Sequence, residues 1–85
     1  MKQEQYRELD ILLDCVAEAK ASLDEGEVDT AIWLLDIFLK KEVDESLRAI
    51  VENARQKLIN GDLNEAGKLL ESAIDILMRK LSEAR

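Results

Sequence analysis

Two stretches of this sequence follow one pattern, and this repeat limits the fold more than any other feature does. Residues 16–39 (VAEAKASLDEGEVDTAIWLLDIFL) align with residues 51–74 (VENARQKLINGDLNEAGKLLESAI) at a shift of 35 positions. In both, apolar residues recur at three- and four-residue steps on each side of a glycine, which is the spacing of amphipathic helices. Each copy therefore predicts two helices joined by a glycine-containing turn, and such units bury a shared core when they stack. The identical pairs are Val16/Val51, Ala19/Ala54, Leu23/Leu58, Gly26/Gly61, Ala31/Ala66, Leu34/Leu69 and Leu35/Leu70.

The glycines mark where helices should end. We expect a first helix from about residue 3 to residue 24, because Gly26 suits the left-handed position just past a helix end. A second helix should begin two residues after this glycine. After Gly61, Asp62 and Glu65 have the spacing of a capping box, which predicts the start of the last helix.

The segment between the two repeats allows two interpretations. No glycine or proline occurs from Ala31 to Leu58, and the apolar residues keep helical steps throughout. One continuous helix would be roughly 48 Å long, and part of it would lie uncovered in a three-helix monomer. The polar cluster KKEVDES at 40–46 provides a break instead, with Asp44 as the N-cap of a separate helix. The repeat favours the break.

The composition also favours an all-α fold. The 85 residues include no proline, three glycines and one each of Trp, Tyr and Phe, while 47% are hydrophobic, so the core must be aliphatic. Helix-forming residues dominate, and few residues are β-branched. We predict a single helical domain, residues 1–85, in which four antiparallel helices form two stacked helical hairpins (units about 3–41 and 44–84). Three helices with one long central helix are the alternative.

A family resemblance follows from the repeat. The pattern A-x3-L-x2-G-[DE]-[VL]-[DN]-x-A, followed by LL, resembles the tetratricopeptide repeat, most closely in GDLNEAGKLLESAIDIL at 61–77. There Gly61 and Asp62 lie at the turn, and Ala66 and Ala73 match the small residues of the family. The first unit departs from the pattern at Phe38, where the family has a small residue. This resemblance implies paired helical hairpins that associate with other proteins.

A second, weaker resemblance covers residues 9–58. The segment L-D-E-G-E-V-D-T-A-I with the following L-D-I-F-L is similar to the FIMAH domain, a small helical module of bacterial multidomain proteins. This resemblance also implies association with proteins or domains rather than catalysis. Both resemblances depend on packing residues, so they imply a helical hairpin before they imply an activity.

The charge of the chain limits its partners. Nineteen acidic and twelve basic residues give a net charge of −7. Nucleic acids and anionic membranes bind proteins through Lys and Arg, so we expect neither as a partner, and a basic protein is the better match. A lone cysteine, Cys15, cannot form an internal disulfide, which favours a reducing compartment. No apolar run approaches the roughly 20 residues of a membrane span, and the charged first residues are unlike a signal peptide, so we expect a cytoplasmic protein.

The residue inventory offers little catalytic chemistry. The chain has no histidine, which removes the commonest general base and metal ligand, and Cys15 lies beside an apolar stripe as a buried, inert thiol would. DEGEVD at 24–29 lacks the twelve-residue frame of a calcium loop. A carboxylate bundle that binds two metal ions would need Glu-x-x-His pairs. We therefore predict no enzyme activity, no catalytic or metal-binding residue, no cofactor and no small-molecule substrate.

Three acidic residues share one face of the first helix. Asp10, Asp14 and Glu18 follow one another at steps of four. A solvated face is the simplest interpretation, because like charges at this spacing disfavour a helix unless something compensates. The alternatives are a docking face for a basic partner and a site for a hard cation.

The stretch AIWLLDIFL at 31–39 is too apolar for an ordinary amphipathic helix. Leu34 and Leu35 recur in the second unit and belong to the core, whereas Trp33 and Ile37 align with Lys68 and Ser72. Either the first helix covers this pair or a partner does. We predict a protein–protein interaction module, a homodimer through the second helix, with these apolar anchors: Trp33, Ile37 and Phe38. An acidic adaptor, mimic or chaperone for a basic partner is the alternative, and a metal-binding carboxylate four-helix bundle is a third, weaker one.

Overall fold

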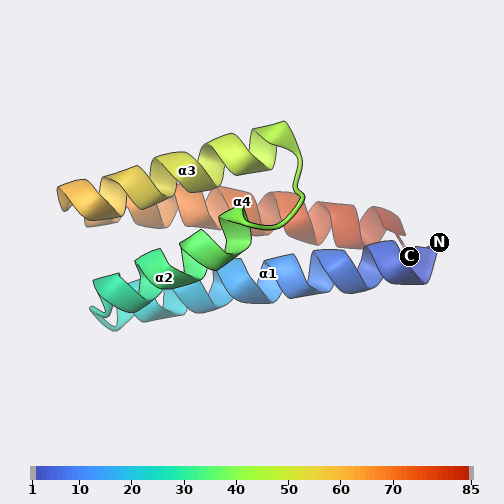
Figure 1. Cartoon of the computed structure of the whole chain (residues 1–85), viewed down its shortest axis with the longest axis horizontal. Helices are drawn as coiled ribbons and strands as arrows, with labels where there is room; N and C mark the ends of the chain where they lie inside the picture. The colour runs from blue at the N-terminus through green and yellow to red at the C-terminus, as the bar shows by residue number, and fades with distance from the viewer. Residues whose placement is uncertain (1, 85) are drawn as a thin grey trace.

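Four helices form a bundle in the computed structural model, which describes residues 2–84 and the side chains of residues 6–84 (Figure 1). No strand occurs within this range. The helices are α1 (Lys2–Asp24), α2 (Val28–Leu39), α3 (Glu45–Asn60) and α4 (Leu63–Ala84). The prediction of four helices is confirmed, and the alternative with one long central helix is wrong, because the chain leaves the helical path at residues 40–44.

The two hairpin turns are built alike. Gly26 and Gly61 have φ angles of +81° and +85°, in the left-handed region that residues with a Cβ rarely adopt. In each turn the N–H of the residue after the glycine donates to a carbonyl five positions back, at 2.8 Å for Glu27 and 2.9 Å for Asp62. The glycine N–H donates three positions back. This hydrogen-bond pair satisfies carbonyls that the helix end would leave free, and it explains why glycine recurs in both units.

The connection between α2 and α3 is held from both sides. The guanidinium of Arg48 on α3 donates to the carbonyl oxygens of Leu39, at 2.9 Å, and Lys41, at 3.0 Å. Asp44 occupies the N-cap position of α3, as predicted, yet its side chain makes no capping hydrogen bond. Its carboxylate lies 2.6 Å from Nζ of Lys80 on α4 instead. Side chains of α3 and α4 therefore fix the break in the central segment.

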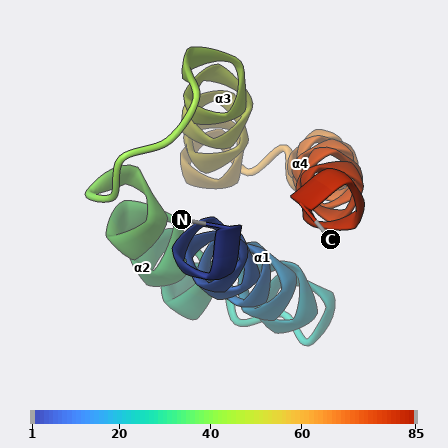
Figure 2. The same cartoon turned by 90° about the vertical axis from the view of Figure 1, so that its right-hand side faces the viewer.

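The helices form a closed ring around one core (Figure 2). Helix α1 packs against α2 and α4, while α3 packs against α4 and, over the smallest contact of the four, against α2. A fully buried alanine lies on every helix: Ala19, Ala31, Ala54, and both Ala66 and Ala73 on α4. Small side chains at these positions let neighbouring helices approach closely. The largest buried side chains are Phe38, Leu35, Leu47, Leu70, Leu77, Val16 and Val51.

The helices differ in length, and this shapes one end of the bundle. Helices α1 and α4 have 23 and 22 residues, whereas α2 has 12 and α3 has 16. At the end where α1 begins and α4 finishes, these two helices extend past the other two (Figure 1). None of the helices within residues 2–84 is long and apolar enough to cross a membrane.

Candidate functional site

Helix α2 carries a large apolar side chain on its outer side. Its inner side is buried in the core, whereas Trp33 remains 61% exposed and Ile37 is half-buried. At the position aligned with Trp33, the second hairpin has Lys68, whose side chain is 75% exposed. The equivalent surface of the second hairpin is therefore polar, and the exposure of Trp33 is particular to the first. The buried residues of α2 are Ala31, Leu34, Leu35 and Phe38.

The position of Phe38 requires a correction. We expected this residue among the interface anchors, but its side chain is fully buried. It lies one turn after Leu34, on the stripe that faces the core. Its aligned residue, Ala73, is also fully buried, so both units use this position for packing. A partner cannot contact Phe38 on the folded chain, and we remove it from the interface.

Charged residues lie at both ends of the pair formed by Trp33 and Ile37. Asp29, Trp33, Ile37 and Lys40 follow one another at steps of four, four and three residues, so they lie along one side of α2 and its C-cap residue. Asp29 and Lys40 are exposed. We call these four residues the outer stripe. Sequence reasoning identified its centre and missed the opposite charges at its ends, although their spacing was available.

The remaining charge of the apolar stretch, Asp36, has a structural role. Its carboxylate accepts a hydrogen bond at 2.5 Å from Nε of Arg55 on α3. The side chains of Asp36 and Arg55 are 42% and 36% exposed, so the pair lies at the surface over the seam between α2 and α3. This pair neutralises Asp36, so Asp29 and Lys40 are the charges that flank Trp33 and Ile37 on the outer stripe.

The acidic residues predicted on the first helix are all exposed: Asp10, Asp14 and Glu18. None of them forms an ion pair with another residue of the part of the chain that the structure describes. The thiol of Cys15 donates to the carbonyl oxygen of Leu34 at 3.1 Å, so these two residues lie side by side where α1 contacts α2.

Cys15 is a packing residue. Its side chain is buried, and burial raises the pKa of its thiol above the ordinary value of 9.0, while the nearby ammonium of Lys41 has a smaller opposing effect. A buried thiol with a raised pKa carries little thiolate at neutral pH and is a poor nucleophile. Within residues 6–84, the structure brings together no group of three or more Cys, Asp or Glu residues that could hold a metal ion.

Comparison of the chain with protein-family models, with curated proteins and with solved structures found no match. The resemblances to the tetratricopeptide repeat and to the FIMAH domain therefore remain predictions. The geometry of the outer stripe and of its surroundings carries the functional argument.

Proposed function

We propose that this chain is a non-enzymatic protein–protein interaction module that self-associates through the outer stripe of α2. The observation that carries the proposal is the 61% exposure of Trp33 at a position where the second hairpin uses Lys68. Tryptophan is enriched among the few residues that dominate binding energy, because it buries much apolar area with few rotatable bonds. Binding of a partner against α2 would bury the side chain of Trp33 and remove it from water.

The charges of the stripe support a second copy as the partner. Two antiparallel copies of α2, related by a two-fold axis, would set Trp33 of each against Ile37 of the other. Asp29 lies about 6 Å before Trp33 along the helix, and Lys40 lies about 4.5 Å after Ile37. The carboxylate of one copy would thus fall near the ammonium of the other, at both ends of the contact.

The chemistry of the chain supports binding rather than catalysis. Its sequence has no histidine, and its one thiol is buried and has a raised pKa. A single free cysteine fits a reducing compartment, so the proposed location is the cytoplasm. The tetratricopeptide-like pattern of the hairpins agrees with a scaffold role.

Sedimentation equilibrium tests self-association. Trp33→Lys copies the side chain of the second hairpin and should shift the protein from dimer to monomer. Met78→Lys is the matched control, because Met78 is 56% exposed, lies on α4 and undergoes the same change in charge. We expect wild type and Met78→Lys to remain dimers. A monomeric wild type, or equal weakening by both substitutions, would contradict the proposal.

An acidic adaptor for a basic partner is the second candidate function. It is favoured by the exposed carboxylates of Asp14 and Glu18, which lie near Cys15 in the sequence, and the thiol of Cys15 contacts Leu34, the neighbour of Trp33. The two candidates differ in their response to salt. Added salt screens both the repulsion between two copies of charge −7 and the attraction between Asp29 and Lys40, so it should change an apolar homodimer little, whereas it should weaken binding of a basic protein.

A further inference from the structure

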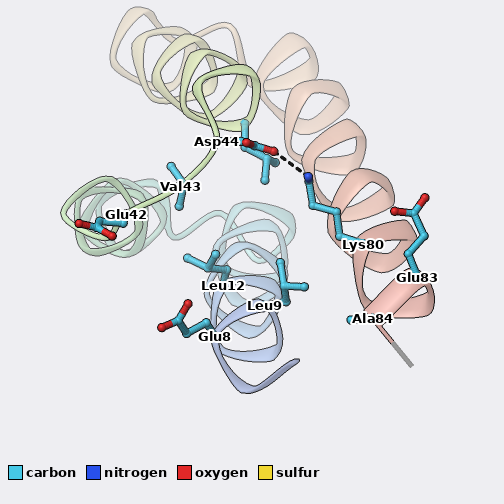
Figure 3. Close-up of a pocket in the computed structure, with 10 residues that line it drawn as sticks. Glu8, Leu9, Leu12, Glu42, Val43, Asp44, Lys80, Glu83 and Ala84 are labelled. Carbon is cyan, nitrogen blue, oxygen red and sulfur yellow. Dashed lines mark ion pairs between the residues drawn. The ribbon is translucent and has the colours of Figure 1, made fainter. Parts of the chain in front are cut away.

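The open end of the bundle contains a groove that the outer stripe does not touch. Because α2 and α3 are shorter than α1 and α4, an open cavity of about 420 Å³ lies between the first half of α1, the last turns of α4 and the loop at 42–44. Figure 3 shows its lining side chains coming from α1, from this loop and from α4. A second cavity of about 330 Å³ adjoins it along α1.

The floor of this end groove is apolar. Leu12 and Leu47 are buried at its base, and Leu9 and Val43 are half-buried beside them. The second cavity shares Leu12 with the first and adds Ile11, which is 47% exposed. The apolar side chains of the two cavities lie beside the first half of α1, where α2 is too short to cover them.

The rim of the groove is acidic. Four carboxylates from three elements line the first cavity: Glu8, Glu42, Asp44 and Glu83. Lys80 is the one basic residue among the described residues that line the first cavity, and its Nζ is 2.6 Å from the carboxylate of Asp44 (Figure 3). Three carboxylates therefore remain without an ion pair to any other described residue. Lys41 lines the second cavity. Among the described residues that line the two cavities, four carboxylates outnumber two ammonium groups, so this part of the rim is acidic.

We propose that the end groove binds one amphipathic, basic helical segment of a partner protein. Apolar side chains at helical spacing would lie on the leucines, and flanking Lys or Arg side chains would meet Glu8, Glu42 and Glu83. A second copy of this chain is a poor occupant, because it would bring the same carboxylates face to face. The surface is separate from the outer stripe, so the inference does not depend on self-association.

Synthetic peptides test the groove. The probe is a fluorescein-labelled, helix-forming peptide of 18 residues, designed with leucines along one face and lysines along the other; its partner peptide has glutamate in place of every lysine. Fluorescence anisotropy measures the Kd of each for the wild-type protein. We expect binding of the lysine peptide only. Binding of neither peptide, or of both with equal affinity, would overturn the proposal.

Charge-matched variants locate the binding surface. The rim variant E8Q/E42Q/E83Q and the face variant D10N/D14N/E18Q remove the same number of negative charges, and all six residues are exposed. We expect the rim variant to raise the Kd of the lysine peptide about tenfold, which corresponds to three modest surface ion pairs, and the face variant to change it less than about twofold. An equal loss of affinity in the two variants would mean that the peptide responds only to the overall negative charge of the protein and does not occupy the groove.

Trp33 separates the two surfaces. The lysine peptide should bind Trp33→Lys with the wild-type Kd, and it should leave the fluorescence of the single tryptophan in the wild-type protein unchanged. A weaker Kd for Trp33→Lys, or a shift of tryptophan emission on binding, would move the peptide to the outer stripe and overturn the assignment to the end groove. Failure of the homodimer would leave this result unaffected.

Discussion

Arg48, in the first turn of α3, donates a hydrogen bond from its guanidinium to the carbonyl oxygen of Leu39, the last residue of α2, at 2.9 Å. The second terminal nitrogen of the same group reaches the carbonyl oxygen of Lys41 at 3.0 Å. The carbonyls at the end of a helix have no hydrogen-bond partner within the helix, and a cation there also interacts favourably with the negative end of the helix dipole. One side chain thus ties the end of α2 to the first turn of α3.

Removal of this side chain should destabilise the fold. For Arg48→Met, which keeps the aliphatic stem, we expect the free energy of unfolding to fall by about 1–3 kcal/mol, because two partly buried hydrogen bonds from a charged donor are lost. Urea denaturation followed by circular dichroism measures the change. Arg79→Met is the control, since Arg79 is exposed on α4. Equal stabilities of the two variants would show that other contacts hold the break.

Two glycine substitutions should have effects of opposite sign. Gly61→Ala forces a Cβ into a φ of +85° and should lower the free energy of unfolding by about 1–2 kcal/mol. Gly67 lies inside α4, where a Cβ would meet side-chain atoms of Lys20 and Leu23 at 3.7 and 3.8 Å, which are ordinary contact distances. Gly67→Ala should therefore raise the free energy of unfolding by about 0.5–1 kcal/mol. Thermal melts of both variants and of wild type measure these changes. Destabilisation by Gly67→Ala would mean that the surroundings of Gly67 have no room for a Cβ.

The two aromatic residues of α2 should respond very differently to truncation. Phe38 is fully buried, so Phe38→Ala should cost about 3–5 kcal/mol of stability through lost contacts and a cavity. Trp33→Ala should change the stability of the monomer by no more than about 0.5 kcal/mol, because its side chain is mostly in water. Chemical denaturation at high dilution separates monomer stability from self-association. A large loss for Trp33→Ala at high dilution would place it in the core.

The thiol of Cys15 should make stability depend on alkaline pH. Burial raises its pKa in the folded chain above 9.0, so the unfolded chain releases the proton first as the pH rises. The stabilising contribution is complete below the unfolded pKa and is lost as the pH rises through the folded pKa. Wild type should therefore lose free energy of unfolding relative to Cys15→Ala from about pH 8.5 upward. The other titrating groups are common to both proteins, and parallel pH profiles would contradict the expectation.

Local sequence signals predicted the helices and their ends. The apolar steps, the glycines at 26 and 61 and the polar cluster at 40–46 each act within a few residues of chain, and the structure contains the corresponding elements. The repeat also contained a signal that we did not use fully. It aligns Phe38 with Ala73, a small residue of the kind that packs in a helix-helix contact, and this alignment would have predicted a core position for Phe38. Both side chains are fully buried.

Other features depend on contacts between distant segments, and no local pattern predicts them. The pairing of Arg55 with Asp36 joins two helices, and the pairing of Lys80 with Asp44 joins α4 to the loop. Many charged residues were candidates for such pairs, and the register between helices selects among them. The end groove arises from a difference in helix length together with the contact of α1 and α4, so its residues become neighbours only after the bundle closes.

The contact between α1 and α4 has a topological consequence. These helices are antiparallel neighbours, so α1 begins at the same end of the bundle where α4 finishes (Figure 1). If a linker joined the end of α4 to the start of α1, the backbone could be opened at residues 40–44 instead, which would keep all four helices whole. In such a circular permutant Arg48 and Leu39 would no longer be close along the chain. Their hydrogen bond would then have to hold two free ends together, as a non-covalent clasp.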